Sequence, residues 1–138
     1  MEIRGLLNAH RDGKRFDYPD GTWVVVKSFS TSEAMAARER LEAEAYARLG
    51  LDLEAGKLPM DASAQLMADV AAAAVVLDFG GHTLDGEEMK PTLENKTLLL
   101  SLPPIRGRWF ASAASLDKLN QAMEESAKGN SSAPSSPN

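Results

Sequence analysis

The sequence predicts a small α+β domain that is mainly α-helical, with an N-terminal β-hairpin and a second short hairpin or turn before the C-terminal helices. Turn-forming residues at 19–21 separate two strand-like segments, and glycine-containing turns at 80–81 and 85–86 interrupt stretches of helical periodicity. The 138 residues suit one domain, which we expect to cover residues 1–128. Residues 129–138 are polar and rich in Ser and Pro, so we expect a disordered tail.

The N-terminal hairpin is predicted over residues 14–28. The proline and glycine of residues 19–21 suit a tight turn, because proline restricts φ and glycine tolerates positive φ. Residues 22–26 form the clearest strand of the chain, since β-branched and aromatic side chains dominate them. We interpret Trp23 as a packing residue of the hairpin or the core.

A first helix is predicted over residues 31–49. A hydroxyl side chain at position 30–32 can accept a hydrogen bond from the first free amides, and Gly50 can end the helix in a left-handed conformation. On the polar side, Glu44 and Arg48 have the spacing of an i,i+4 ion pair. The apolar face consists of Ala34, Ala37, Leu41 and Ala45, with Met35 and Leu49 beside it.

A second helix is predicted at about residues 62–74, after a connector at residues 51–59, with Asp61 or Ser63 as its cap. Its many alanines would allow another helix to approach its backbone closely. Residues 75–79 can either finish this helix or form a strand. The two glycines that follow favour a turn or a short hairpin.

Two helices are predicted in the C-terminal part of the chain. The first covers residues 92–102 and ends at two prolines, because proline disfavours helical conformation at the residue before it. The second covers residues 105–128, with a potential break near Gly107, and ends at Gly129. Its apolar side chains recur at helical spacing, at Ile105, Trp109, Ala113, Leu116, Leu119 and Met123.

Composition and charge exclude several classes of function. The net charge of −5 argues against nonspecific nucleic-acid binding, which requires basic patches that displace counterions from phosphates. Without cysteine there can be no disulfide, thiolate metal site or cysteine nucleophile. The longest apolar run, residues 70–77, is far shorter than the roughly 20 residues that span a bilayer. We therefore expect a soluble protein without an export signal.

No arrangement of residues in the sequence indicates catalysis. His10 and His82 have no partner at a catalytic spacing, and the glycines do not extend into a phosphate-binding motif. His82 lies near Asp78 and Asp85, which would allow a weak metal site. Turn chemistry and surface solvation explain these residues better. We expect neither enzymatic activity nor a cofactor.

The order of segments between Val75 and Phe110 resembles that of the small tail assembly chaperones of long-tailed, siphovirus-type bacteriophages. In that family an apolar strand-like segment with a glycine turn follows a helix. An acidic Asp-Gly turn, a leucine helix that begins with Pro and Thr, and an amphipathic final helix come next. The corresponding segments here are VVLDFGG (75–81), LDGEEM (84–89), PTLEN (91–95) and residues 109–125. The resemblance extends more loosely over most of residues 14–128, whereas the Ser/Pro-rich tail departs from it.

The resemblance implies a role in tail morphogenesis. Such chaperones bind the long helical tape measure protein, keep it soluble until tail tube subunits polymerise around it, and are absent from the mature virion. Many are also made in a longer, frameshifted form that recruits the tail tube protein. The resemblance therefore implies that the tape measure protein is a partner, that a longer form would bind the tail tube protein, and that the protein is located in the host cytoplasm. We also expect that the protein can form homo-oligomers.

An apolar face of the last helix is the predicted partner-binding surface, because an amphipathic rod is best covered by an apolar helix face. Its candidate residues are Trp109, Phe110, Leu116, Leu119 and Met123. The same stripe could instead pack into the core of the protein itself. The alternative function is a structural virion component, such as a minor tail or head–tail joining protein.

Overall fold

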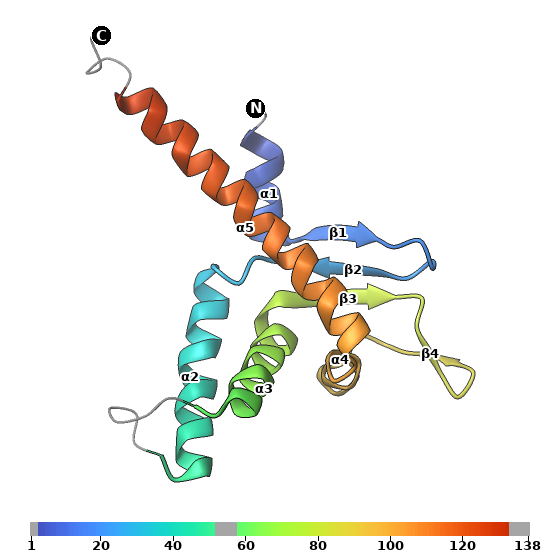
Figure 1. The fold of residues 1–138 in the computed structure, drawn as a ribbon. Helices are drawn as coiled ribbons and strands as arrows, with labels where there is room; N and C mark the ends of the chain where they lie inside the picture. The colour runs from blue at the N-terminus through green and yellow to red at the C-terminus, as the bar shows by residue number, and fades with distance from the viewer. Residues whose placement is uncertain (1–2, 52–57, 133–138) are drawn as a thin grey trace.

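The computed structural model describes residues 3–51 and 58–132 and confirms the predicted α+β fold (Figure 1). A three-stranded sheet, a short hairpin and several helices make up these residues. The elements are, in order, α1 (Ile3–Asp12), β1 (Lys14–Asp17), β2 (Trp23–Val26), α2 (Ser32–Leu49), α3 (Met60–Val70), the π-helical turn η1 (Ala71–Val75), β3 (Val76–Gly80), β4 (Thr83–Leu84), β5 (Glu87–Glu88), α4 (Leu93–Leu100) and α5 (Pro103–Ser132).

The sheet is antiparallel, with the strand order β1–β2–β3. β1 and β2 form the predicted N-terminal hairpin, and residues 76–80 form a strand that pairs with β2 after two helices have intervened. In this register Val24 lies between Phe16 of β1 and Phe79 of β3. The predicted turn at 85–86 closes the β4–β5 hairpin, with both of its residues at positive φ.

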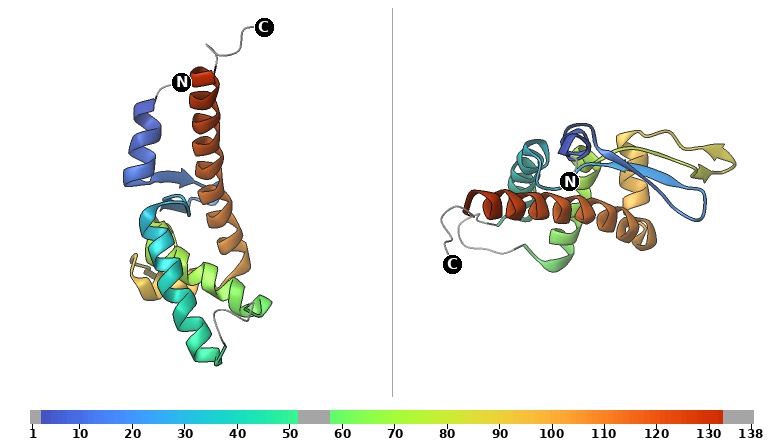
Figure 2. Two further views of the ribbon diagram at one scale, coloured as in Figure 1. Left: turned by 90° about the vertical axis from the view of Figure 1, so that its left-hand side faces the viewer. Right: turned by 90° about the horizontal axis from the view of Figure 1, so that it is seen from above.

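The hydrophobic core lies between one face of the sheet and the helices. β2 alternates between half-buried and fully buried side chains, as expected of a strand with one covered face. α5 passes across β2, while α2 and α3 pack against each other (Figures 1 and 2). The core includes Val24, Val26, Val70, Val75, Val76, Phe79, Leu99, Leu100, Trp109, Ala113 and Leu116.

α2 begins and ends as predicted. Thr31 Oγ1 accepts a hydrogen bond from the amide of Ala34 at 3.1 Å, and Gly50 closes the helix at φ 67°. The predicted Glu44–Arg48 pair is wrong, because Glu44 instead lies 3.7 Å from Arg40 on the preceding turn. The partner of Glu44 is therefore the arginine four residues before it on the same helix, not the arginine four residues after it.

The start of α3 differs from the prediction. Pro59 occupies the N-cap position and its side chain makes no capping hydrogen bond, so the prediction of Asp61 or Ser63 as the N-cap residue is wrong. Asp61 Oδ1 accepts from the amide of its neighbour Ala62 at 3.0 Å. The hydrogen bond to Asp61 satisfies one of the free amides of the first turn, which a proline side chain at the N-cap position cannot do.

α5 is longer and more continuous than predicted. Pro103 and Pro104 form its first turn, where proline costs no intrahelical hydrogen bond, and Gly107 does not interrupt it. Gly129 does not end it either, since the helix continues to Ser132. Residues 129–132 therefore belong to the helix, and the rest of the predicted tail lies outside the described residues.

α1 has no counterpart in the sequence prediction. It places Ile3 and Leu7 one turn apart, and each is 52% exposed. The helix lies beside α5 (Figure 2, left). Within residues 3–51 and 58–132, no helix combines the length and the apolar character that a membrane span requires.

Candidate partner-binding groove

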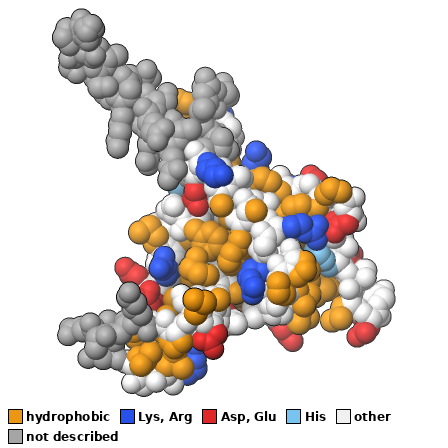
Figure 3. All heavy atoms as spheres, in the orientation of Figure 1, with side chains coloured by type: hydrophobic (Ala, Val, Ile, Leu, Met, Phe, Trp, Pro, Cys, Tyr) orange, Lys and Arg blue, Asp and Glu red, His pale blue; other side chains and the backbone are white. Residues whose placement is uncertain are grey.

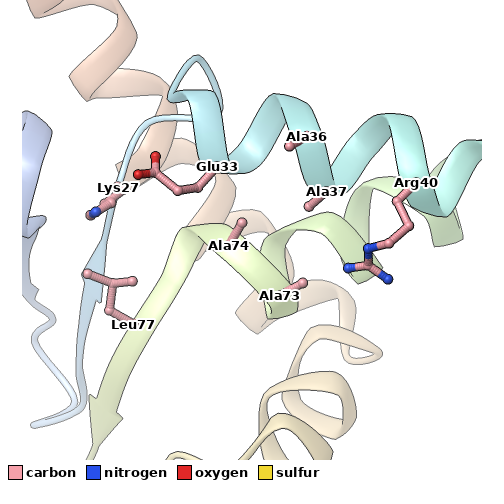
Figure 4. Close-up of a pocket in the computed structure, with 8 residues that line it drawn as sticks. All are labelled: Lys27, Glu33, Ala36, Ala37, Arg40, Ala73, Ala74 and Leu77. Atoms are coloured by element: carbon pink, nitrogen blue, oxygen red, sulfur yellow. The ribbon is translucent and has the colours of Figure 1, made fainter.

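An open groove of about 490 Å³ lies where α2 faces η1 and the start of β3 (Figure 4). We refer to it as the alanine groove. Its lining residues are Lys27, which follows β2, Glu33, Ala36, Ala37 and Arg40 of α2, Ala73 and Ala74 of η1, and Leu77 of β3.

The groove stays open because four of its lining residues are alanines. An alanine side chain ends at Cβ, so the backbones of α2 and η1 face each other without long side chains between them. Ala36 and Ala73 are exposed, whereas Ala37 is buried against the domain. Leu77 is 38% exposed and provides the one large apolar side chain of the lining.

The π-helical turn η1 forms the side of the alanine groove that faces α2 (Figure 4). The amide of Val76 donates to the carbonyl of Ala71, and Val76 then adopts an extended conformation that starts β3. The amide of Lys27 donates to the carbonyl of Val75 at 2.8 Å, which ties the end of β2 to the same point. π-helical turns are rare and occur frequently at functional sites.

Three charged residues surround the alanines. Glu33 lies in the first turn of α2, where a hydrogen bond from its own backbone amide and then the charge of Lys27 lower the pKa of its carboxyl. The guanidinium of Arg40 lies 3.7 Å from Glu44, and both side chains are more than half exposed. Exposed pairs of this kind contribute little free energy, so Arg40 can exchange its partner at low cost.

The structure does not gather the five predicted partner-binding residues on one exposed face. Trp109 is 1% and Leu116 is 5% exposed, so both belong to the core of the protein itself. Phe110 is half-buried, with its ring 5.3 Å from Phe29 in an edge-on contact. Leu119 and Met123 lie on α5, but their side chains are outside the described set. Helical spacing alone cannot distinguish a core stripe from a binding stripe.

The alanine groove was not identified from the sequence. A signal for it exists, because two helices that neighbour each other in the fold carry adjacent alanines at 36–37 and 73–74. The prediction that alanines of the second helix allow close approach is consistent with the packing of α2 against η1. What the sequence does not show is that these alanines remain partly uncovered.

The weak metal site considered for His82 with Asp78 and Asp85 is not assembled. His82 packs against Phe79 and Trp109 instead, at ring-centroid distances of 5.9 and 6.1 Å. Among the described residues, no three His, Asp or Glu side chains are grouped so that they could hold a metal ion.

Comparisons with protein-family models, with curated proteins and with solved structures returned no match for this chain.

Proposed function

We propose that this protein is a phage tail assembly chaperone that binds helical segments of the tape measure protein and keeps it soluble while the tail tube assembles. The order of segments between residues 75 and 110 supports this proposal, through its resemblance to that family. The structural observation that carries it is the alanine groove, an open groove on the surface of the domain in which alanines and Leu77 lie among three charged residues.

The shape of the alanine groove suits an amphipathic helix. Such a helix presents apolar side chains at i, i+3, i+4 and i+7, and it binds by placing them in an apolar groove. A volume of about 490 Å³ can receive large side chains from a partner because the alanines leave it unfilled. Leu77 would then add contact area at the β3 end.

The surroundings of the groove suit a partner with both apolar and charged side chains. Lys27 and Arg40 provide positive charge, and Glu33 provides negative charge. On the face that Figure 3 shows, apolar side chains gather in patches with Lys and Arg between them. The net charge of −5 would help to keep a coated rod in solution.

Co-expression with a candidate tape measure protein tests the proposal. We expect the tape measure to stay in the soluble fraction with the wild-type protein and to precipitate with Ala36→Leu or Ala73→Leu, which fill the groove from its exposed positions. Ala43→Leu adds the same side chain to an exposed position of α2 outside the groove lining and is the matched control. A tape measure that stays insoluble with excess wild-type protein would exclude the function.

Mass spectrometry of purified virions separates this function from the alternative. A chaperone should be missing from mature particles, whereas an abundant copy number would support a structural virion component. If both groove-filling variants still solubilise the tape measure, the function stands and the binding site lies elsewhere.

A further inference from the structure

His82 lies in an aromatic cluster at the base of the β4–β5 hairpin. Its ring is edge-on to those of Phe79 in β3 and Trp109 in α5, with interplanar angles of 71° and 77°. Phe79 and Trp109 are both almost fully buried. Part of the imidazole therefore packs into the interior of the domain.

Two nitrogen atoms of this cluster, His82 Nε2 and Trp109 Nε1, are buried and have no hydrogen-bond partner among the described residues. The indole N–H can only donate, whereas Nε2 of a neutral imidazole with its proton on Nδ1 carries no hydrogen. Protonation of His82 would add a second buried, unpaired N–H and a positive charge at this place. Burial of such a group without a partner is costly.

Charged groups from two elements act on His82 in the described part of the chain. Burial lowers the pKa of the imidazole most, Asp20 in the β1–β2 turn raises it, and Arg108 on α5 lowers it. Asp20 already accepts hydrogen bonds from Arg108 at 3.0 Å and from the hydroxyl of Thr22 at 2.6 Å. The charges of Asp20 and Arg108 therefore act in opposite directions, and burial is the cause that lowers the pKa of His82.

We propose that His82 is a pH-sensitive latch whose neutral form holds the base of the β4–β5 hairpin at Trp109 of α5 and whose protonation releases it. The backbone connects the ring to the hairpin, since the amide of Met89 donates to the carbonyl of His82 at 3.0 Å. Met89 is itself buried. Displacement of His82 therefore removes the hydrogen bond from Met89 and the ring contacts with Phe79 and Trp109 at the base of the hairpin.

The direction of the pH effect follows from the pKa. His82 has a lower pKa in the folded protein than the ordinary 6.5, so as the pH falls below 6.5 the released form binds a proton before the latched form does. The latch is therefore closed at higher pH and weakens as the pH falls from 6.5 toward the pKa of the folded state. Above 6.5 both forms are neutral and the effect vanishes.

Amide hydrogen exchange at Met89 measures the latch directly. Between about pH 7.5 and about pH 5.5, we expect the protection factor of this amide to fall in the wild-type protein. His82→Phe keeps a ring in the cluster but cannot be protonated, so the protection factor of Met89 should not decrease in this variant. His10→Gln, which changes the exposed histidine of α1, is the matched control and should keep it.

The NMR titration of the wild-type imidazole provides a second test that does not require a variant to fold. A His82 pKa below 6.5 supports the latch, and a value at or above 6.5 overturns it. An unchanged Met89 protection factor in wild type, or a fall of the same size in His82→Phe, would overturn it as well.

Discussion

The two sides of this domain are packed in opposite ways. Where α5 crosses the sheet, large rings fill the space, and Trp109 contacts Phe79 and His82 in one aromatic cluster. Where α2 faces η1, alanines leave the alanine groove open. The difference shows that side-chain volume decides which contact becomes closed core and which stays accessible, although helices form both sides. Substitutions that reverse this volume difference provide the sharpest tests.

Removal of the central ring should have the largest effect. Trp109→Ala empties the middle of the aromatic cluster, and we expect it to lower the free energy of unfolding by about 3–5 kcal/mol. Phe110→Ala, at the next position of the same helix but half-buried, should cost clearly less. Urea denaturation of both variants measures the difference. Equal losses would mean that α5 does not pack on the sheet through Trp109.

An added methyl group where two backbone segments approach closely should have the next largest effect. A Cβ on Gly81 would lie 2.9 Å from the carbonyl oxygen of Gly21, and its φ of 86° is strained for any side chain. We expect Gly81→Ala to cost about 1–3 kcal/mol in denaturant unfolding. Gly86 has a similar φ of 82° but no atom within 4 Å, so Gly86→Ala should cost less. Equal losses of stability in the two variants would show that the strain of a positive φ, and not the contact with Gly21, determines the effect.

The same kind of addition should be tolerated on the open side. Ala36→Leu and Ala73→Leu point into the alanine groove, so we expect the free energy of unfolding to change by no more than about 0.5 kcal/mol. Circular dichroism during urea denaturation provides the measurement, with Ala43→Leu as the reference. A loss comparable to that of Gly81→Ala would contradict the open groove.

The smallest expected effect concerns the β1–β2 turn. Hydrogen bonds from the Thr22 side chain and backbone, followed by Arg108, lower the pKa of Asp20 from 3.8 to about 2. Because the folded-state pKa is lowered, the contribution of Asp20 is present above pH 3.8 and is lost as the pH falls toward about 2. Asp20→Asn should therefore reduce the acid sensitivity in this window, as measured by unfolding against pH. Asp17→Asn, on the neighbouring strand, is the control.

Much of the fold could be predicted from local sequence signals. The turn at residues 19–21, the Thr31 cap and Gly50 end of α2, and the 85–86 turn are each determined by a few adjacent residues, and the structure confirms them. The end of α5 could not be predicted in the same way, because glycine only permits a helix to stop. α1 was not predicted because it is short and has a glycine, Gly5, in its first turn.

The sequence by itself determined the α+β class, the N-terminal hairpin and the apolar stripe of the last helix. Only the tertiary structure decided that this stripe packs inward at Trp109 and Leu116, and that residues 76–80 become a strand on β2. It also decided that alanines at 36–37 and 73–74 face each other across an open groove. The physical reason is that periodicity specifies which residues share a face, while the surface that covers this face comes from residues distant in the chain.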